Sequence, residues 1–282
     1  MAAILRDTSD EALAAAIDAN QAAQFGLLAA CMGGETHDEP DAIWFVTGLD
    51  YALFNGVMRA RLAPETEERR IDELIAPFRT RGLEMTWHVG SSSRPNELGA
   101  LLQQHGLWRE LGSPGMAVEL ARLPDERQRI ARLAIEPVRD EATFAVWLDV
   151  MARGFDMPAI ARDAIGVACR RFGFAPGAAM RHYLGLLRGE PVASSTLFLA
   201  EGVAGIYNVA TLPQARRQGI GAAMTRAPLL EARTEGLCIG VLQSSRMGLN
   251  VYWQLGFRPY SRLIQYGWHP GSAFQGSGAT AL

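Results

Sequence analysis

Two arginines and two glycines lie close together where an apolar run leads into a predicted helix. The segment reads ATLPQARRQGIGAAMTR and covers residues 210–226. Glycine lets backbone N–H groups approach an anion, and the first turn of a helix leaves N–H donors without partners. Arg216 and Arg217 add charge-assisted donors beside Gly219 and Gly221. The segment therefore predicts an anion-binding turn, with a diphosphate as its ligand.

Two other phosphate motifs fit this turn poorly. A P-loop requires G-x-x-x-x-G-K-[ST], and no such lysine follows. A dinucleotide-binding turn would have Gly or Ala at its sixth place, which is Met224 when counted from Gly219. A purely structural interpretation stays open, in which the glycines only permit a tight connection between strand and helix.

A second motif follows the first along the chain. Residues 244–257 read SSRMGLNVYWQLGF, similar to N/S-x-x-A/G-x-x-x-Y-x-x-x-G-F, and residues 216–221 read RRQGIG, which matches R/Q-x-x-G-x-G/A. With both motifs in this order, the sequence over about 134–268 resembles the GNAT superfamily of N-acetyltransferases, which hold the pyrophosphate of acetyl-CoA at the first motif. The resemblance implies a mixed α/β fold and acetyl-CoA, or another short acyl-CoA, as co-substrate.

The resemblance implies a role for individual residues around both motifs. The backbone of Val209, Ala210 and Thr211 would face the pantetheine arm and the acetyl carbonyl. Tyr252 would be the general acid that protonates the departing CoA thiolate, and the alternative is a tyrosine that only packs on a buried helix. The other cofactor contacts would come from Arg216, Arg217, Gln218, Gly219, Ile220, Gly221, Ala222, Ser245 and Gly248.

Acyl transfer to an amine also needs a neutral nucleophile, and the sequence shows no obvious base. A free alkyl amine has a pKa near ~10, so little of it is neutral at physiological pH. The strand before the turn reads GIYNVATL and contains Tyr207 and Asn208 but no carboxylate. Either residue could relay a proton through water, and Asp156 or Glu190 could supply a carboxylate from elsewhere. An amine of low pKa or a hydroxyl acceptor is a further alternative.

Three other side chains are candidates for contact with the acceptor. His182 lies next to a predicted strand and could reach the acceptor site, although a histidine there is more often a satisfied or surface residue. Trp44 and Asn55 are weaker candidates in the first half of the chain. The spacing of histidines, cysteines and carboxylates predicts no metal site.

Composition narrows the class of partner and the compartment. The 282 residues carry a formal net charge of −3 and are 49% apolar, which favours packed cores and gives no overall attraction for nucleic acid. The three cysteines are far apart, which fits a reducing compartment. Asp7, Asp10 and Glu11 interrupt the N-terminal apolar stretch, and no segment reads as a membrane span. We expect a cytoplasmic protein, with no prediction of its oligomeric state.

The repeated pattern and the resemblance together imply two GNAT-like α/β units, each a central mixed, mostly antiparallel sheet flanked by helices. Residues 1–123 form the first unit and 134–282 the second, and 121–139 read as a partly helical connection. The segments 89–110 and 242–260 share a serine-serine-arginine run, a short helix and a glycine followed by an apolar residue. Duplication explains this echo, and chance similarity is the alternative.

Apolar periodicity and turn residues predict the individual elements. The expected strands cover 42–47, 51–62, 84–89, 115–120, 183–187, 192–199, 205–212, 237–242 and 262–266. The expected helices cover 65–80, 96–105, 141–155, 160–172, 218–234 and 247–255.

The first unit lacks the residues that would bind CoA in the second. Leu102 stands four residues before Gly106, where the second unit has Tyr252 before its own glycine. The helix start in APETEERRIDEL is acidic and would repel a pyrophosphate. We expect a degenerate unit that forms a scaffold or one wall of the acceptor cleft. A unit that never bound CoA is the alternative.

These expectations combine into one predicted reaction. The second unit would be an acyl-CoA-dependent N-acyltransferase that moves an acetyl group to a small-molecule amine by direct attack in a ternary complex. A non-catalytic acyl-CoA-binding sensor or regulatory protein is the alternative, because no base is evident. Tyr252 favours the enzyme. The acceptor and the acyl-chain length are not predicted.

Overall fold

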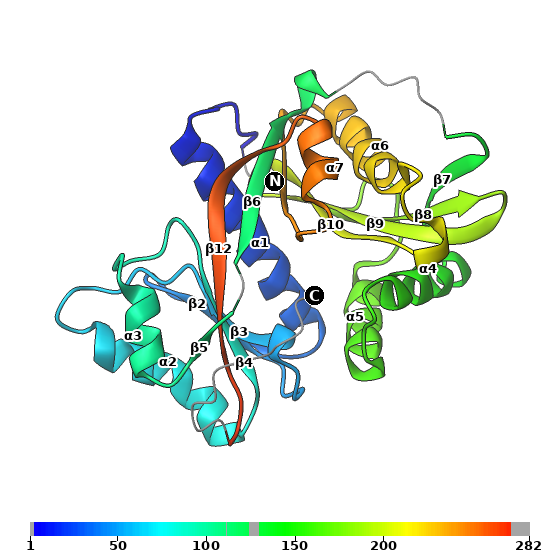
Figure 1. Ribbon diagram of the computed structural model, residues 1–282. Coiled ribbons are helices and arrows are strands. Elements are labelled where there is room, and N and C mark those ends of the chain that lie inside the picture. Colours follow the sequence, from blue (N-terminus) through cyan, green and yellow to red (C-terminus); the bar gives the residue numbers. More distant parts are fainter. Residues whose placement is uncertain (1–2, 111, 124–129, 272–282) are drawn as a thin grey trace.

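The computed structural model describes residues 3–110, 112–123 and 130–271. Their strands follow one path through a large mixed sheet, in the order β1-β2-β3-β4-β12-β6-β11-β10-β9-β8-β7, with β5 paired to β12 (Figure 1). The strands are β1 (Glu35–Asp38), β2 (Ile43–Val46), β3 (Asn55–Met58), β4 (Met85–Val89), β5 (Trp108–Arg109), β6 (Ser113–Glu119), β7 (Leu133–Pro137), β8 (Met180–Leu187), β9 (Glu190–Ala200), β10 (Val203–Thr211), β11 (Ile239–Gln243) and β12 (Arg258–Trp268).

Helices flank this sheet, which makes the mixed α/β architecture that the sequence predicts. The α-helices are α1 (Asp10–Cys31), α2 (Glu67–Arg81), α3 (Leu98–Gln104), α4 (Glu141–Gly154), α5 (Ala159–Phe172), α6 (Ile220–Thr234) and α7 (Leu249–Gln254). Short 3-10 helices are η1 (Ala52–Phe54), η2 (Leu120–Arg122) and η3 (Pro213–Ala215). Within the described residues, none of the helices is long and apolar enough to cross a lipid bilayer.

The second half of the chain builds its part of the sheet from a meander and one crossover. β8, β9 and β10 are antiparallel neighbours, and a tight turn after Leu187 joins the first two. α6 then returns the chain along the sheet, so that β11 runs parallel to β10. Val192, Met224 and Leu242 belong to the core between α6 and these strands. This crossover places the start of α6 at the end of β10.

The first half repeats part of this plan. β2 and β3 are antiparallel, α2 crosses over, and β4 runs parallel to β3. A short helix then ends at a left-handed glycine in both halves, at Gly106 after α3 and at Gly256 after α7, with φ of 84° and 94°. The echo between segments 89–110 and 242–260 therefore corresponds to the same strand, helix and turn.

Each half lends a strand to the other. β6 comes from the first half and lies between β11 and β12, antiparallel to both. β12 pairs with β6 through Leu263 and continues from Ile264 alongside β4. Figure 1 shows β12 as one long strand that passes from one half to the other. The division at 123 and 134 stays a prediction, and any such units share this pair of strands.

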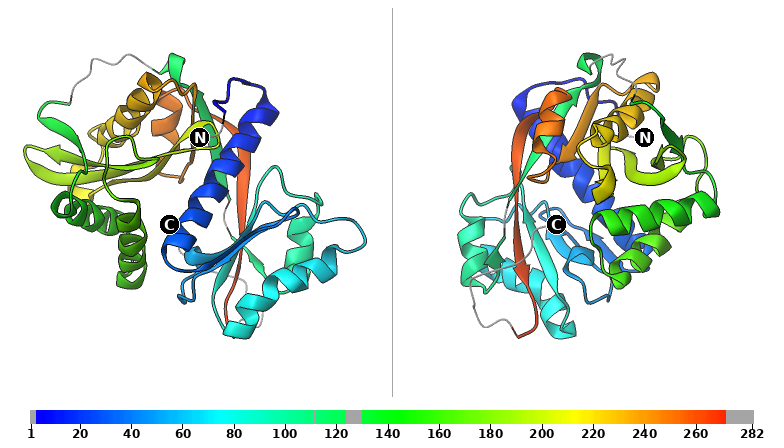
Figure 2. Two further views of the ribbon diagram at one scale, coloured as in Figure 1. Left: turned by 180° about the vertical axis from the view of Figure 1, so that it is seen from behind. Right: turned by 45° about the vertical axis from the view of Figure 1, so that its right-hand side comes forward.

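The N-terminal helix α1 is the largest element that the sequence analysis did not predict. Ser9 caps it by accepting a hydrogen bond from Ala12 N. Its Leu13 and Ile17 pack on β6, β10 and β11, and Asn20 Nδ2 donates to Ala200 O at 3.0 Å. Figure 2 shows α1 lying across the sheet where the two halves meet. The helix is rich in alanine and lacks a strong amphipathic pattern, which explains why periodicity did not reveal it.

Two predicted segments have a different structure. The expected strand over 51–62 is a 3-10 turn followed by the short β3, and Arg59 directly after β3 adopts a left-handed φ of 54°. The expected connection over 121–139 ends in β7, whose Leu133 and Ile135 alternate toward the core beside β8. Alternation over so few residues is a weak signal amid many charges. Part of that connection, 124–129, lies outside the described residues.

Candidate active site

The C-terminal ends of β10 and β11 separate, which leaves one edge of β10 unpaired. The two parallel strands pair only at Ala204 with Gly240 and at Gly205 with Val241, and β10 continues well beyond these pairs. Free N–H and C=O groups along such an edge can bind an extended ligand. The unpaired part includes the predicted residues Val209, Ala210 and Thr211.

A β-bulge sets the path of this strand end. The register with β9 shifts between Tyr207 and Ala210, and Asn208 between them has a φ of 52°. Asparagine tolerates this conformation better than most residues. Its carbonyl accepts from Ser194 Oγ at 2.9 Å, and its Nδ2 donates to Thr196 Oγ1 at 3.1 Å. Strand β9 therefore holds both the backbone and the side chain of Asn208.

His182 continues the series of hydrogen-bonded side chains from Asn208 through Thr196 into the core. Its Nδ1 is 2.9 Å from Thr196 Oγ1, and its ring centroid is 4.1 Å from that of Trp147 in α4. Only 2% of His182 is exposed, and loss of solvent lowers its pKa to about 3. Because Thr196 Oγ1 accepts from Asn208, its own hydrogen is free for the imidazole. A neutral His182 thus supports Thr196, which the sequence analysis did not single out.

The turn before α6 has the geometry of an anion site. Arg217 and Gly219 are left-handed, with φ of 62° and 78°. Gly219 gives α6 no capping side chain, and the first helical bond runs from Ala223 N to Gly219 O at 3.1 Å. The N–H groups just before that bond point out of the helix start with no place in its ladder. They belong to Ile220, Gly221 and Ala222.

Arg216 serves the turn itself. Its Nε donates to Thr211 O at 2.9 Å and its guanidinium also reaches Gly154 O at 3.4 Å, so it ties the turn to β10 and α4. Arg217 and Gln218 are exposed. Among the described residues, a Cβ at Gly221 would meet only Thr211 Oγ1, at 4.0 Å, so they leave open space beside this glycine. Of the two predicted arginine donors, Arg217 is therefore the one whose side chain has no hydrogen bond to the turn within the described residues and lies exposed to solvent.

Ser245 and Gly248 form the start of α7 and make room for Tyr252. Gly248 N donates to Ser245 Oγ at 3.2 Å. A Cβ at Gly248 would lie 2.8 Å from the ring of Tyr252, which is closer than real Cβ contacts. The glycine of the second motif therefore lets the tyrosine ring pack against the helix start.

Tyr252 is a buried, protonated phenol close to the start of α6. Only 9% of it is exposed, and burial raises its pKa to about 12, partly offset by a hydrogen-bonding contact with Thr225. The Thr225 hydroxyl also donates to Gly221 O at 2.9 Å. One side chain thus links the phenol to the first turn of the helix.

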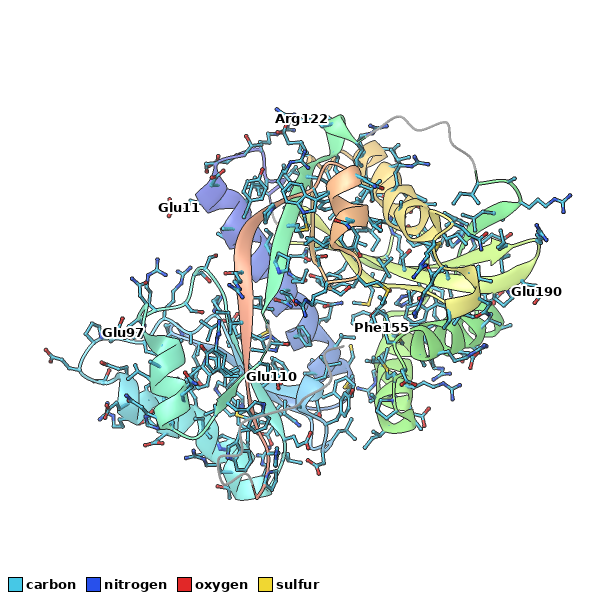
Figure 3. All side chains as sticks on the ribbon, viewed as in Figure 1. Glu11, Glu97, Glu110, Arg122, Phe155 and Glu190 are labelled. Carbon is cyan, nitrogen blue, oxygen red and sulfur yellow. The ribbon has the colours of Figure 1, made fainter. Side chains whose placement is uncertain are left out.

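The candidate bases occupy different places. The Tyr207 hydroxyl donates to Asn20 Oδ1 at 2.7 Å, and burial raises its pKa. Asp156 is exposed with a φ of 51°, just after Gly154, which packs on the end of β10. Glu190 is exposed and stands at the outer tip of the β8–β9 hairpin (Figure 3). Of the two carboxylates, Asp156 therefore lies on the loop that touches β10.

In the first half, the chain itself closes the corresponding strand ends. β3 and β4 pair in parallel only at Gly56–Val57 before they separate. Beyond that point Arg94 N donates to Ala60 O at 2.9 Å, and Leu62 N donates to Arg94 O at 3.0 Å. Leu102, which matches Tyr252 in the sequence, is completely buried. Backbone therefore fills the gap that stays open in the second half.

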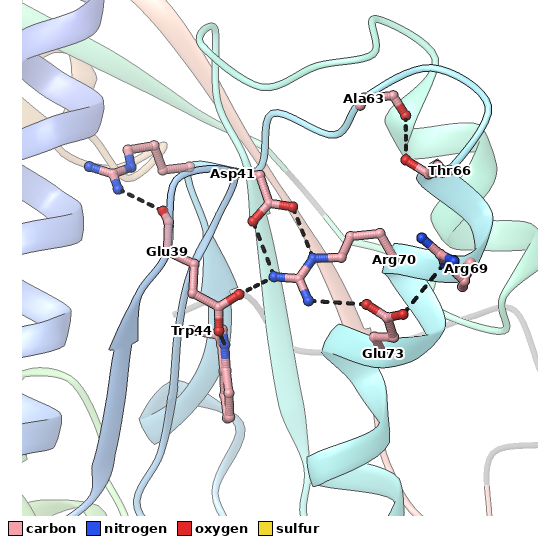
Figure 4. A network of polar contacts seen from close by, with 9 residues as sticks. Glu39, Asp41, Trp44, Ala63, Thr66, Arg69, Arg70 and Glu73 are labelled. Carbon is pink, nitrogen blue, oxygen red and sulfur yellow. Dashed lines mark hydrogen bonds and ion pairs between the residues drawn. The ribbon is translucent and has the colours of Figure 1, made fainter.

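Trp44 and Asn55 have structural partners in the first half. Asn55 is fully buried, and its Nδ2 donates to Leu49 O at 2.7 Å. Trp44 Nε1 donates to Glu39 at 2.8 Å, within a network of carboxylates around Arg70 (Figure 4). These contacts account for both side chains without a ligand. In the described part of the chain, no set of three His, Cys, Asp or Glu side chains is placed to bind a metal ion.

Solved structures identify the fold. A GCN5-related N-acetyltransferase from Kribbella flavida matches with a TM-score of 0.69 and 19% identity, over 91% of this chain and 96% of its own. Another, from Sphaerobacter thermophilus, matches with a TM-score of 0.60 and 14% identity, over 81% and 76%. The chain has the GNAT fold. A tandem GNAT protein from the clavulanic acid biosynthesis pathway matches with a TM-score of 0.57 and 14% identity, over 83% and 79%.

The GNAT fold includes both halves of the chain, because these matches cover most of it. The resemblance that the two sequence motifs suggest is thus confirmed at the level of the fold, and so is the mixed α/β class. No family model matches the chain, and no curated protein is significantly similar to it in sequence.

Proposed function

We propose that this chain is an acyl-CoA-dependent N-acyltransferase that moves an acetyl group from acetyl-CoA to a small-molecule amine by direct attack in a ternary complex. The proposal rests on three features that lie close together. The unpaired edge of β10, the uncapped start of α6 and the protonated Tyr252 all lie at the same end of the sheet. These are the parts needed to hold a thioester and to protonate its leaving sulfur.

The chain offers a suitable place for each part of acetyl-CoA. The N–H groups of Gly221 and its two neighbours, which have no partner within the described residues, would hold the pyrophosphate together with Arg217. The open space beside Gly221 fits this use. The edge at Val209 and Ala210 would hold the pantetheine arm and direct N–H groups at the carbonyl oxygen. Bound acetyl-CoA supplies the activated acetyl group. Ser245 and Gly248 would shape the cofactor side of α7.

Tyr252 would move the proton that the leaving group needs. Its pKa of about 12 keeps the phenol protonated at neutral pH and above the usual pKa of a thiol, so the equilibrium alone does not drive the transfer. A phenol held against the sulfur lowers the kinetic barrier to this transfer and leaves its equilibrium unchanged. The proton leaves the phenolic oxygen for the sulfur, and the phenolate regains a proton from solvent. The amine loses its own proton to a carboxylate or to a relaying water.

Asn208 is the group that we expect to orient the acceptor. Its Nδ2 is held by Thr196, which leaves Oδ1 as the acceptor end of the amide for an N–H of the amine or for a relaying water. Asp156, on the loop after Gly154, is the carboxylate best placed to take up the proton. His182 would act indirectly, because it contacts Thr196.

The first half would serve as a degenerate GNAT unit, over 1–123, beside a catalytic unit over 134–282. Its closed strand ends and buried Leu102 support loss of CoA binding there. It contributes β6 and α1 to the neighbourhood of the active site.

A panel assay tests the proposal against the sensor alternative. Free thiol release from acetyl-CoA is measured over small primary amines, amino acids and amino sugars, beside calorimetric binding of CoA. Amine-dependent thiol release supports the enzyme. Binding of CoA without turnover on any member would favour the sensor, and absence of CoA binding would contradict both.

A further inference from the structure

The bulge in β10 rotates one peptide unit out of the regular pairing with β9. Between two paired positions, β10 advances from Tyr207 to Ala210 while β9 advances by one residue fewer. Asn208 and Val209 therefore lie opposite a single residue of β9, as in a β-bulge. Asn208 is left-handed, with a φ of 52°, so the peptide unit that follows it does not have the direction of a regular strand. Its carbonyl thus needs a donor from elsewhere.

Ser194 of β9 supplies that donor. Its Oγ donates to Asn208 O at 2.9 Å, and the residue is fully buried. The adjacent Ser195 is equally buried, but its Oγ has no hydrogen-bond partner within the described residues. Burial of a serine on this strand therefore does not by itself produce such a contact. The Ser194 hydroxyl fixes the direction of the Asn208 carbonyl.

The direction of this carbonyl also sets the direction of the next N–H group. The peptide bond between Asn208 and Val209 is trans, and in a trans peptide the C=O and the N–H point in opposite directions. Because the carbonyl faces Ser194 on β9, the Val209 N–H points away from β9. That is the side on which β10 and β11 pair no further than Gly205 with Val241. Val209 is only half-buried, so a ligand along this edge can reach it.

We propose that Ser194 is a positioning residue for the acyl transfer, which aims the Val209 N–H at the thioester carbonyl oxygen by holding the Asn208 carbonyl. That oxygen gains negative charge when the amine attacks, and a fixed N–H donor stabilises it. The donor keeps its proton throughout. Without the hydroxyl, the peptide unit is free to turn and the N–H is no longer held at one angle. The inference rests on the proposed function, because it names a residue that serves the same reaction.

Calorimetric binding of acetyl-CoA and S-ethyl-CoA to the full-length chain tests the proposal. In S-ethyl-CoA a methylene group replaces the thioester carbonyl, so the two ligands differ at the atom that the Val209 N–H would contact. We expect the wild type to bind acetyl-CoA about two- to tenfold more tightly, as for one hydrogen bond. Ser194→Ala should bring the ratio of the two affinities close to one and lower kcat about tenfold or more.

Ser195→Ala is the matched control. It removes an equally buried hydroxyl from the next position of β9 without loss of a hydrogen bond within the described residues. We expect this variant to keep the wild-type ratio and kcat. A ratio near one in the wild type, an unchanged ratio in Ser194→Ala, or the same fall in Ser195→Ala would overturn the positioning role and leave the CoA site standing. If the wild type binds neither ligand, the proposed function fails as well.

Nuclear magnetic resonance of the wild type decides the question if Ser194→Ala does not fold. The resonance of the Val209 N–H proton should move downfield with acetyl-CoA and much less with S-ethyl-CoA, because only acetyl-CoA offers a carbonyl acceptor. Equal shifts with the two ligands would show that this N–H does not contact the thioester carbonyl, and would overturn the proposal.

Discussion

Thr196→Val tests whether the buried polar chain positions Asn208. Valine has nearly the shape of threonine but cannot bond to Asn208 or His182. Thr196 is fully buried, so the change removes two interactions without opening a cavity. It also leaves the buried Nδ1 of His182 without a partner.

The expected magnitudes follow from these contacts. Each lost hydrogen bond contributes about 0.5–1.5 kcal/mol, and an orphaned buried polar group costs about 1–3 kcal/mol. Since the valine methyl gains apolar burial, we expect the free energy of unfolding to fall by about 2–3 kcal/mol. If Asn208 orients the acceptor, its loosened side chain should lower kcat about tenfold, with little change in the affinity for acetyl-CoA.

Urea unfolding followed by tryptophan fluorescence measures the first effect, and Trp147 beside His182 is a local reporter. Thiol release measures the second. Thr80→Val, at an exposed position of α2, is the matched control and should change neither quantity appreciably. A loss of stability with unchanged kcat would refute the positioning role. The hydrogen bonds among His182, Thr196 and Asn208 would then serve only the stability of the fold.

Three further predictions rest on other contacts. Tyr252→Phe should lower kcat about 100-fold or more while CoA affinity stays within a few-fold, and an equal rate would remove the phenol from the mechanism. Gly248→Ala should lower kcat by a smaller factor than Tyr252→Phe. Its new Cβ would lie 2.8 Å from a carbon of the Tyr252 ring and would displace that ring, so a crystal structure with the ring unmoved would contradict this. Acid should destabilise the chain below about pH 6.5, since His88 and His182 resist a proton that the unfolded chain accepts. Each contributes a slope of up to about 1.4 kcal/mol per pH unit, and a flat stability profile from pH 7 to 5 would disprove it.

Local motifs predicted the turn and the helix starts of the second half well, because these features depend on short-range backbone geometry. The glycines of RRQGIG imply a left-handed turn before a helix, and Gly219 has that conformation. The spacing in SSRMGLNVYWQLGF places Gly248 one helical turn before Tyr252, and their contact explains why residue 248 is a glycine. A left-handed backbone and a close contact with a ring can be predicted from the sequence because glycine satisfies both.

Long-range pairing was not visible in the sequence. β6 and β12 read as ordinary final strands, and nothing in their alternation indicates that each pairs across the halves. The sequence did not indicate α1, because its many alanines give no clear periodic apolar face. The same limit applies to Thr196, whose importance comes from neighbours on β8 and β10. Arg216 has a contact that the sequence did not indicate, since its Nε also donates to Thr211 O and holds the turn to β10.

The most direct test of the central claim is calorimetric binding of acetyl-CoA to the wild type and to Gly221→Glu. The new carboxylate would lie in the open space at the start of α6, where repulsion of a bound pyrophosphate costs on the order of a few kcal/mol per charge pair at close range. Ala142→Glu adds the same charge at an exposed position in the first turn of α4 and is the control. We predict micromolar-range binding that survives in the control and weakens about 100-fold or more in Gly221→Glu. Equal affinity in all three proteins would contradict the assignment of this turn to the CoA pyrophosphate.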